Sequence, residues 1–298
     1  MKFSLIVATK NRVNEVDRFL RSLVAQSYRE FEVIIIDQNS DERLVNVVNC
    51  YHQEFTITHI QKASLGVSRV RNQGRLLAKG DIIAYPDDDC VYPPDVLAKV
   101  AHFFKSSLTW DGLTVRVMDL ESDRDAFDYC LQKSGIVDCL TAWSLGIGPA
   151  MFFRAELAKK IAFDETLGPG SGTPWGCGED TDYLLQCVEN HAAVYYDFEL
   201  FVRHPQPYAI YSLRQLAWRE FTYGQGFGYL LKKRNISLPT VLYLFLEPML
   251  LMAKYTMVGN FRYALPCPGM ALGRVLGYWG GVRKFTKGKL HEFEILSN

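Results

Sequence analysis

Short apolar runs alternate with helical stripes in the first third of the chain, and this alternation constrains the fold more than any other feature. Residues 3–9 (FSLIVAT) and 31–37 (FEVIIID) are rich in strand formers, and apolar residues at helical spacing follow each of them. Residues 56–61 (TITHIQ) repeat the unit with a helix ending at a Gly80 cap, and residues 81–85 (DIIAY) form a fourth strand. The pattern predicts an α/β fold with a mostly parallel sheet covered by helices on both faces.

Polar clusters follow three of these predicted strands. They are residues 9–12 (TKNR), 37–42 (DQNSDE) and 87–89 (DDD). Sheets of this kind bind ligands outside the carboxyl ends of their strands, near the point where the strand order reverses. We therefore expect the three clusters to meet at one edge of the sheet.

The third cluster places three carboxylates side by side, at Asp87, Asp88 and Asp89. Adjacent carboxylates repel one another unless a cation or fixed donors share the site. Magnesium or manganese takes one or two protein carboxylates together with water and substrate phosphates. An acidic turn with Asp95 capping the next helix is the alternative, and for D-D-D alone it is the better interpretation. The neighbouring polar clusters favour a divalent cation and a diphosphate.

A second acidic group lies where a glycine-rich loop, residues 168–178, enters a predicted helix at Glu179 and Asp180. The loop lacks the G-K-[ST] ending of a phosphate-binding loop, and its glycines suit a lid that can close. Trp175 in this loop either stacks on an acceptor sugar or anchors the loop by packing. The sequence leaves both interpretations open.

The composition of the whole chain excludes some classes of protein. The 33 Lys and Arg balance the 33 Asp and Glu, so a generic nucleic-acid binder is not expected. Seven cysteines, an odd number without a C-x-x-C pair, suit a reducing compartment and predict a cytoplasmic protein. We interpret the apolar start as a first strand and not as a signal peptide.

The character of the chain changes near residue 210, which predicts a sheet domain over residues 1–209 and a helical region over 210–298. Residues 236–253 are apolar but contain Pro239, Glu247 and Pro248, so a transmembrane helix is not expected. Basic and aromatic flanks suit helices that lie in a membrane interface, which would be a peripheral membrane contact. A helical subdomain packed on the sheet domain explains the periodicity equally well.

Five segments in register carry a family resemblance over about residues 1–205. They are FSLIVATKNR, VIIIDQNSD, GVSRVRNQGRLLAKGDIIAYPDDD, GPGSGTPWGCGEDTDYLL and VRHPQP. Together they resemble the bacterial family 2 glycosyltransferases, which have the GT-A fold. The resemblance implies inverting transfer of a sugar from a nucleotide diphosphate donor, with Mn2+ or Mg2+ as cofactor.

The resemblance also implies roles for single residues. Asp89 corresponds to the metal-binding aspartate, with Asp87 or Asp88 reaching the ion or the donor ribose, and His204 matches a position where some members add a metal ligand. Asp180 resembles the catalytic base, and a carboxylate within reach of the acceptor hydroxyl can take its proton. The remaining correspondences are Glu179 (acceptor orientation), Arg71 (diphosphate contact), and Thr9, Asn11, Arg12 and Asp37 (nucleotide pocket).

One position departs from the family pattern, because Gln38 stands where an aspartate commonly pairs with uracil. A glutamine offers a donor and an acceptor and can pair with uracil, thymine or guanine. The resemblance therefore leads us to expect a UDP-, dTDP- or GDP-linked sugar as the donor, and it leaves the base open.

The resemblance places the expected reaction in bacterial surface polysaccharide biosynthesis, at the cytoplasmic face of the inner membrane. The acceptor is expected to be a saccharide, lipid-linked because of the apolar and basic C-terminal region. Two alternatives stay open, a nucleotidyltransferase of similar fold and a non-catalytic assembly partner that binds nucleotide sugar at the membrane. A glycoside hydrolase would need neither the metal nor the nucleotide pocket.

Overall fold

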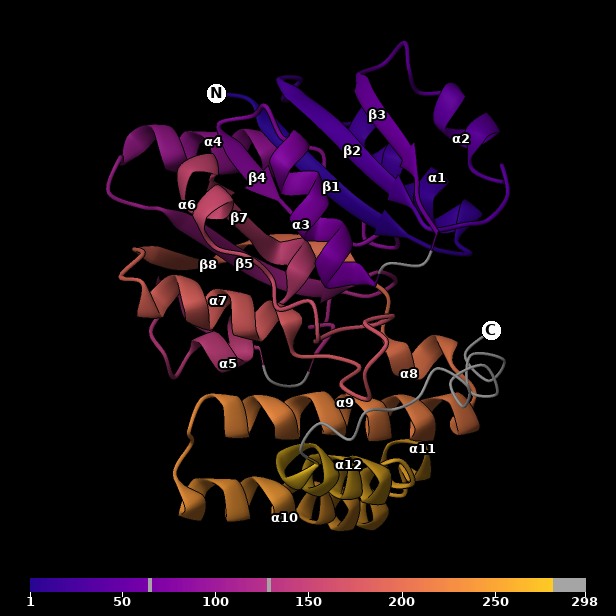
Figure 1. Cartoon of the computed structure of the whole chain (residues 1–298), viewed down its shortest axis with the longest axis vertical. Helices are drawn as coiled ribbons and strands as arrows, with labels where there is room; N and C mark the ends of the chain where they lie inside the picture. The colour runs from indigo at the N-terminus through magenta and orange to yellow at the C-terminus, as the bar shows by residue number, and fades with distance from the viewer. Residues whose placement is uncertain (64–65, 128–129, 281–298) are drawn as a thin grey trace. The chain divides into compact units, whose positions relative to one another are not determined.

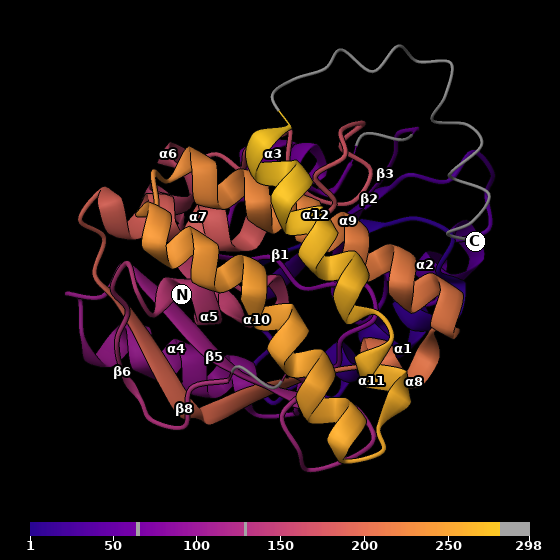
Figure 2. The ribbon, with the colours of Figure 1, turned by 90° about the horizontal axis from the view of Figure 1, so that it is seen from below.

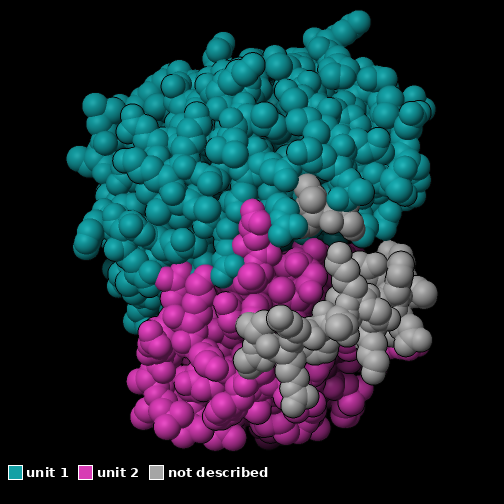
Figure 3. Space-filling view, in the orientation of Figure 1, with its two compact units in different colours: residues 1–164, 180–206 teal, residues 165–179, 207–298 magenta. Residues whose placement is uncertain are grey.

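The structure is a computed structural model that describes residues 1–63, 66–127 and 130–280 (Figure 1). The chain forms two compact units (Figure 3). Unit 1 comprises residues 1–164 and 180–206, and unit 2 comprises residues 165–179 and 207–298. The predicted division at residue 209 stays a prediction, and part of its helical region, residues 281–298, lies outside the described residues.

Unit 1 is built on one mixed sheet whose strand order is β3-β2-β1-β4-β7-β5-β8-β6. Its strands are β1 (Phe3–Thr9), β2 (Phe31–Asp37), β3 (Thr56–Gln61), β4 (Ile82–Ala84), β5 (Gly112–Asp119), β6 (Gly135–Ile136), β7 (Met151–Arg154) and β8 (Val194–His204). The β1–β2, β2–β3, β1–β4 and β5–β8 pairs are parallel. Strand β7 runs antiparallel to both of its neighbours, and β6 runs antiparallel to β8.

Helices cover both faces of this sheet (Figure 1). They are α1 (Val13–Val24), α2 (Val45–Asn49), α3 (Val67–Leu77), α4 (Val96–Ser106), α5 (Ala142–Leu145), α6 (Ala155–Lys160) and α7 (Glu179–Glu189). One core contains Leu5 and Val7 of β1 with residues of α1, α2 and α4, and the other contains Ile6 with residues of α3, α5, α6 and α7. Successive strand residues enter opposite cores because side chains alternate across a sheet.

The predicted α/β sheet with helices on both faces is confirmed. The predicted helix cap at Gly80 is wrong, because α3 ends at Leu77 and Ala78 after it is extended. Gly80 instead lies where the chain passes the start of β1, and a Cβ there would come within 2.7 Å of the Lys2 carbonyl oxygen. The close approach of two backbones explains this glycine.

Unit 2 is helical in its described C-terminal part, as the sequence predicted for that region. Its helices are α8 (Pro207–Ile210), α9 (Leu213–Lys233), α10 (Leu238–Met257), α11 (Phe261–Ala264) and α12 (Cys267–Trp279). Helix α12 packs on α9 and on α10, and Figure 2 shows α10 and α12 side by side. Among the helices described, none combines the length and the hydropathy that crossing a bilayer requires.

Candidate active site

The acidic triplet follows β4 at the point where the strand order reverses. The chain leaves β1 for β2 and β3 on one side, and β4 then pairs with β1 on the other side. Asp87 makes an isolated bridge to Ala8, near the end of β1. Loops after β1, β2 and β4 therefore meet at one edge, as the sequence analysis expected.

Two arginines contact the last two aspartates of the triplet. The Arg12 guanidinium forms an ion pair with Asp88 at 2.8 Å and a second, shorter one with Asp89. Arg18 donates to the Asp89 backbone carbonyl at 3.0 Å. Asp88 and Asp89 are buried, so these donors offset the cost of placing two carboxylates in the interior. Arg12 was expected in the nucleotide pocket, and in this structure it is a counter-ion of the triplet.

Asp87, Asp89 and His204 form a cluster that can hold a metal ion, with one ligand atom from each inside a span of 4.8 Å. The Asp89 Oδ1 atom is buried and accepts no hydrogen bond from the described residues, although His204 Nε2 lies 3.3 Å away. His204 Nδ1 lies 2.8 Å from the Pro205 carbonyl, an acceptor only, so Nδ1 carries a proton and donates. The Nε2 atom then faces the two carboxylates, which is the orientation that ligating histidines have.

The ionisation of the cluster reflects its burial. Burial raises the pKa of Asp87, and it raises the pKa of Asp88 to about 7 against the opposing charge of Arg12. Burial acts in the same direction on Asp89, but His204 and Arg12 outweigh it and lower the pKa of Asp89. Burial would lower the pKa of His204, but the Asp89 carboxylate outweighs it and raises that pKa. The raised pKa values mean that protons bind to groups of this cluster, and a divalent cation would compete with those protons for the same atoms.

Arg71 of α3 connects the cluster with the predicted base. Its Nη1 lies 2.5 Å from Asp180 Oδ1, and its Nη2 lies 3.0 Å from Asp87 Oδ1. The Arg71 side chain is 3% exposed, whereas that of Asp180 is 19% exposed and Asp87 is about a third exposed. The two carboxylates are thus open to a ligand from solvent, and the arginine behind them is not. Its predicted diphosphate contact stays a prediction.

Two glycines that the sequence analysis did not single out frame Asp180. The Gly148 N–H donates to Asp180 Oδ2 at 2.9 Å, and a Cβ at Gly148 would lie 2.5 Å from Arg71 Nη2. A Cβ at Gly146 would lie 2.5 Å from the Thr181 Cα in the first turn of α7. The two closely spaced glycines of residues 146–148 (GIG) are the signal that the sequence offered for them.

The loops after β1 and β2 are bonded to each other. Asn11 has a positive φ of 60°, and its N–H donates to Asn39 Oδ1 at 2.7 Å. Asp37 accepts from the Asn39 backbone N–H at 2.8 Å and lies 3.1 Å from His59 Nε2. Thr9 is buried at the end of β1. The predicted nucleotide-pocket residues thus lie together with Asn39, which belongs to the predicted polar cluster of residues 37–42, and with His59, to which the sequence analysis gave no role.

Gln38 uses its carbonyl oxygen within the protein. Its Oε1 accepts from the Gly66 N–H at 2.9 Å, at the N-cap of α3. The predicted pairing with a nucleotide base would use the amide donor or the second lone pair of Oε1, or would break this bond. The identity of the donor base stays open.

Two predicted acceptor residues belong to unit 2. Trp175 is 6% exposed and stacks on Tyr229 of α9, with ring centroids 3.7 Å apart. It is a packing residue in this structure, and its acceptor role stays a prediction. Glu179 is buried at the first residue of α7. The φ values of Gly168, Gly170, Gly172 and Gly178 are all positive, so the loop uses conformations that favour glycine.

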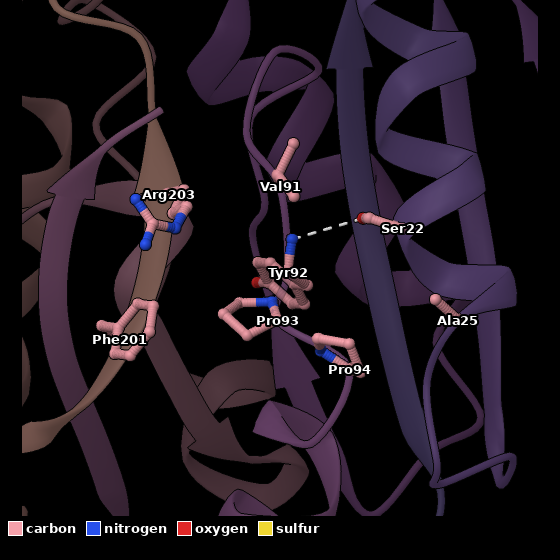
Figure 4. A pocket seen from close by; sticks show the side chains of 8 residues that line it. All are labelled: Ser22, Ala25, Val91, Tyr92, Pro93, Pro94, Phe201 and Arg203. Carbon is pink, nitrogen blue, oxygen red and sulfur yellow. Dashed lines mark hydrogen bonds between the residues drawn. The ribbon is translucent and has the colours of Figure 1, made fainter. Parts of the chain in front are cut away.

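A cavity of about 410 Å³ lies elsewhere in unit 1 (Figure 4). Its lining residues are Ser22, Ala25, Val91, Tyr92, Pro93, Pro94, Phe201 and Arg203. None of the predicted site residues lines it. The lining is mostly apolar and includes Arg203 but no carboxylate or histidine, so the acidic edge of the sheet is the candidate active site.

This combination of fold and acidic edge is that of a GT-A protein. Residues 4–161 match the family described as Glycosyl transferase family 2, which is more than half of the chain. The chain belongs to this family.

Curated relatives agree with this assignment. An uncharacterized glycosyltransferase of Haemophilus influenzae is 30% identical over 192 residues, which cover 62% of each chain. The poly(ribitol-phosphate) beta-N-acetylglucosaminyltransferase TarS of Staphylococcus aureus is 29% identical over 107 residues, 35% of this chain and 19% of TarS. The chain spans less than two thirds of the length of these relatives.

Solved structures share the fold at low sequence identity. The crystal structure of S. aureus TarS 1-349 has a TM-score of 0.59 at 18% identity and covers 96% of this chain and 94% of that one. The mannosyltransferase PcManGT of Pyrobaculum calidifontis, in complex with GDP-Man and Mn2+, has a TM-score of 0.63 at 14% identity, covering 94% and 88%. At this identity the likeness shows the GT-A fold.

Proposed function

We propose that the protein is an inverting, metal-dependent glycosyltransferase of the hexosyltransferase type, which moves a sugar from a nucleotide diphosphate donor to a saccharide acceptor. The observation that carries this proposal is the position of Arg71 between Asp180 and Asp87. One side chain joins the candidate base to the candidate metal cluster, so both lie in one site.

The metal cluster supports a cation-dependent reaction. Asp87, Asp89 and His204 would hold the ion, which would neutralise charge on the donor diphosphate. Imidazole suits transition metals better than magnesium, so this donor set favours Mn2+ over Mg2+. The Mn2+ in the PcManGT complex agrees with that preference.

Asp180 is the proposed general base. Both of its oxygens accept a hydrogen bond, from Arg71 and from Gly148, but each carboxylate oxygen has a second lone pair for an acceptor hydroxyl. As the proton moves to Asp180, the acceptor oxygen forms a bond to the anomeric carbon of the donor sugar. The bond from that carbon to the diphosphate oxygen breaks, and its electron pair leaves with the nucleoside diphosphate.

The donor and acceptor form the finer part of the proposal. Structures of TarS with UDP-GlcNAc and of PcManGT with GDP-Man suggest UDP- and GDP-linked sugars as donors to test. A dTDP-linked sugar joins them because Gln38 can also pair with thymine. We infer that the acceptor is a lipid-linked saccharide of bacterial surface polysaccharide biosynthesis, used at the cytoplasmic face of the inner membrane. Glu179 is proposed to orient that acceptor.

Thermal unfolding in the presence of UDP, GDP or dTDP, each with and without Mn2+, tests the binding part. A ligand that binds only the folded protein raises the unfolding midpoint. We expect one diphosphate to raise it only with Mn2+, and Asp89→Ala to abolish the shift. Asp95→Ala is the matched control, because Asp95 is an exposed acid that pairs with Lys99. No shift with any diphosphate would contradict the proposal.

Release of nucleoside diphosphate tests the catalytic part. Asp180→Asn should remove transfer while donor binding in the thermal assay persists, and Asp95→Asn should leave both unchanged. Nuclear magnetic resonance of the product should show the anomeric configuration opposite to that of the donor. Retained turnover in Asp180→Asn would eliminate Asp180 as the base.

A further inference from the structure

The net charge of the chain divides sharply at the start of the C-terminal helices. Residues 207–298 contain 12 Lys and Arg against 4 Asp and Glu, whereas residues 1–206 contain 21 against 29. The two parts therefore carry net charges of +8 and −8, although the whole chain is neutral. A charge of this size on 92 residues favours an anionic partner.

Helix α10 presents a stripe of exposed leucines. Leu238, Leu242, Leu246 and Leu250 recur every four residues and are between 50% and 63% exposed. Tyr243 beside them is 59% exposed. An adjacent side of α10 is buried through Val241, Phe245 and Pro248. Monomeric soluble proteins rarely expose so long an apolar stripe without a partner for it.

Helix α12 adds a second stripe. Leu272 and Leu276 are 54% and 44% exposed, and Trp279 one turn later is 58% exposed. Because α12 packs on α10 and lies beside it (Figure 2), the two stripes belong to neighbouring helices of one unit. We call the six leucines of these two stripes the helical apolar surface: Leu238, Leu242, Leu246, Leu250, Leu272 and Leu276.

The acids near this surface are neutralised. Residues 207–280 contain two carboxylates, at Glu220 and Glu247. Glu220 is buried and pairs with Arg219 at 2.6 Å, and Glu247 pairs with Arg274 at 2.7 Å. Within residues 207–280, the part of this region that the structure describes, an anionic partner would meet no unpaired acid.

Exposed cations lie at both ends of α10. Lys232 and Lys233 are exposed at the end of α9, a few residues before α10 begins. Lys254 is exposed in the last turn of α10. An exposed apolar stripe flanked by lysines is the arrangement of helices that lie in the interface of an anionic bilayer.

We propose that the helical apolar surface binds the surface of an anionic lipid bilayer, with α10 and α12 lying along one leaflet. The inference deepens the lipid-linked acceptor of the proposed function by naming the surface that meets the membrane. It does not depend on the transfer reaction, since none of its residues belongs to the candidate active site.

Flotation of the full chain with vesicles tests the inference. Vesicles of phosphatidylcholine with phosphatidylglycerol should retain the protein, and retention should fall with added salt because the lysines contribute. Combining Leu242→Gln, Leu246→Gln and Leu250→Gln should lower the lipid partition coefficient at least about tenfold, because three apolar side chains no longer enter the bilayer. The substitutions remove exposed side chains only, so the fold should persist.

The matched control combines Leu76→Gln, Leu108→Gln and Leu140→Gln, three leucines of unit 1 that are 71%, 82% and 80% exposed. This control should float like the wild type. Equal flotation of the α10 variant and the wild type would overturn the inference, as would a wild type that does not float. A dimer in light scattering that the α10 variant abolishes, without vesicle binding, would assign the surface to a second copy and overturn it too.

Transfer to a soluble saccharide acceptor, measured on the same preparations, separates the two proposals. Flotation without any transfer would reject the proposed reaction and keep the membrane surface. Transfer without flotation would keep the proposed reaction and reject the membrane surface.

Discussion

The candidate active site of unit 1 and the α9–α12 crossing of unit 2 bring buried groups together by opposite means. In the site, charged side chains converge, and both Arg12 and Arg71 contact two carboxylates each. In the crossing, side chains are missing, because a Cβ at Gly228 would lie 2.0 Å from the Arg274 carbonyl oxygen and one at Gly277 2.0 Å from that of Gln225. A polar ligand can replace the protein partner of a charged side chain. No ligand can replace the close contact between two helix backbones. The first arrangement suits binding, and the second suits a rigid scaffold.

Replacing the central charge of the site should have the largest effect. Arg71→Met leaves Asp180 and Asp87 near each other without the cation between them, so we expect a loss of about 3–5 kcal/mol in the free energy of unfolding. Urea denaturation measures it. Arg21→Met is the control, because Arg21 pairs with Asp17 on the surface and its loss should not be measurable. Equal urea midpoints for Arg71→Met and wild type would contradict the statement that charged side chains hold the candidate site together.

Adding one methyl group to the crossing should have the next largest effect. Gly228→Ala forces α9 away from α12, and we expect a loss of about 1–3 kcal/mol despite the higher helix propensity of alanine. The measurement is again urea denaturation, followed by the near-ultraviolet circular dichroism of the aromatic residues. Gly135→Ala is the control, since nothing lies within 4 Å of a Cβ there. A stabilised Gly228→Ala variant would show that the helices are not in close contact.

Much of the fold was predictable because burial on both faces leaves a visible pattern in a strand. The runs at β1 and β2 are apolar and buried over nearly their whole length, and they are strands as predicted. Strand β3 lies at the edge of the sheet and is partly exposed, and it is also a strand as predicted. The antiparallel direction of β7 was not predictable, because pairing between segments distant in sequence leaves no local signal. Gly80 was misread for the same reason, since its neighbour is the distant Lys2.

The chemistry of the candidate site was predictable, but its connections were not. The acidic triplet predicts a cation only in the context of the neighbouring polar clusters, and the family resemblance adds His204; Asp87, Asp89 and His204 do lie together. The Arg12–Asp88 pair joins residues 76 positions apart, which no spacing rule indicates. Gly148 acts through its backbone N–H and its lack of a side chain, and neither property distinguishes it from other glycines in the sequence.

Gly148 has features of both regions. Like the glycines of the α9–α12 crossing it allows a close contact, but its contact is with the charged side chain of Arg71 in the candidate site. Gly148→Ala should push Arg71 and shift Asp180, which we expect to lower kcat about tenfold while the KM for the donor changes little. Steady-state release of nucleoside diphosphate measures both constants, and Gly135→Ala is again the control. An unchanged kcat in a folded variant would mean that the position of Asp180 does not limit the reaction.

The smallest predicted effect concerns a buried charge outside the site. Glu32 of β2 is buried and accepts from Lys2 Nζ at 2.7 Å, Ser4 Oγ at 2.6 Å and the Lys79 N–H at 2.8 Å. Burial acts to raise the pKa of Glu32, but these donors outweigh it and lower that pKa. Because the folded-state pKa is below the unfolded one, the carboxylate adds stability above the unfolded value, about pH 4.3, and loses it as the pH falls through the folded value.

Glu32→Gln should therefore be less stable than wild type by on the order of 1 kcal/mol near neutral pH, and the difference should shrink as the pH falls below that value. Urea denaturation across this pH range measures the difference. Transfer by the variant should stay at the wild-type rate, because Glu32 touches none of the residues that carry the proposed reaction. A fall in transfer at unchanged stability would show that a buried charge outside the site influences the reaction. The division between charged groups that serve binding and close contacts that serve the scaffold would then not hold.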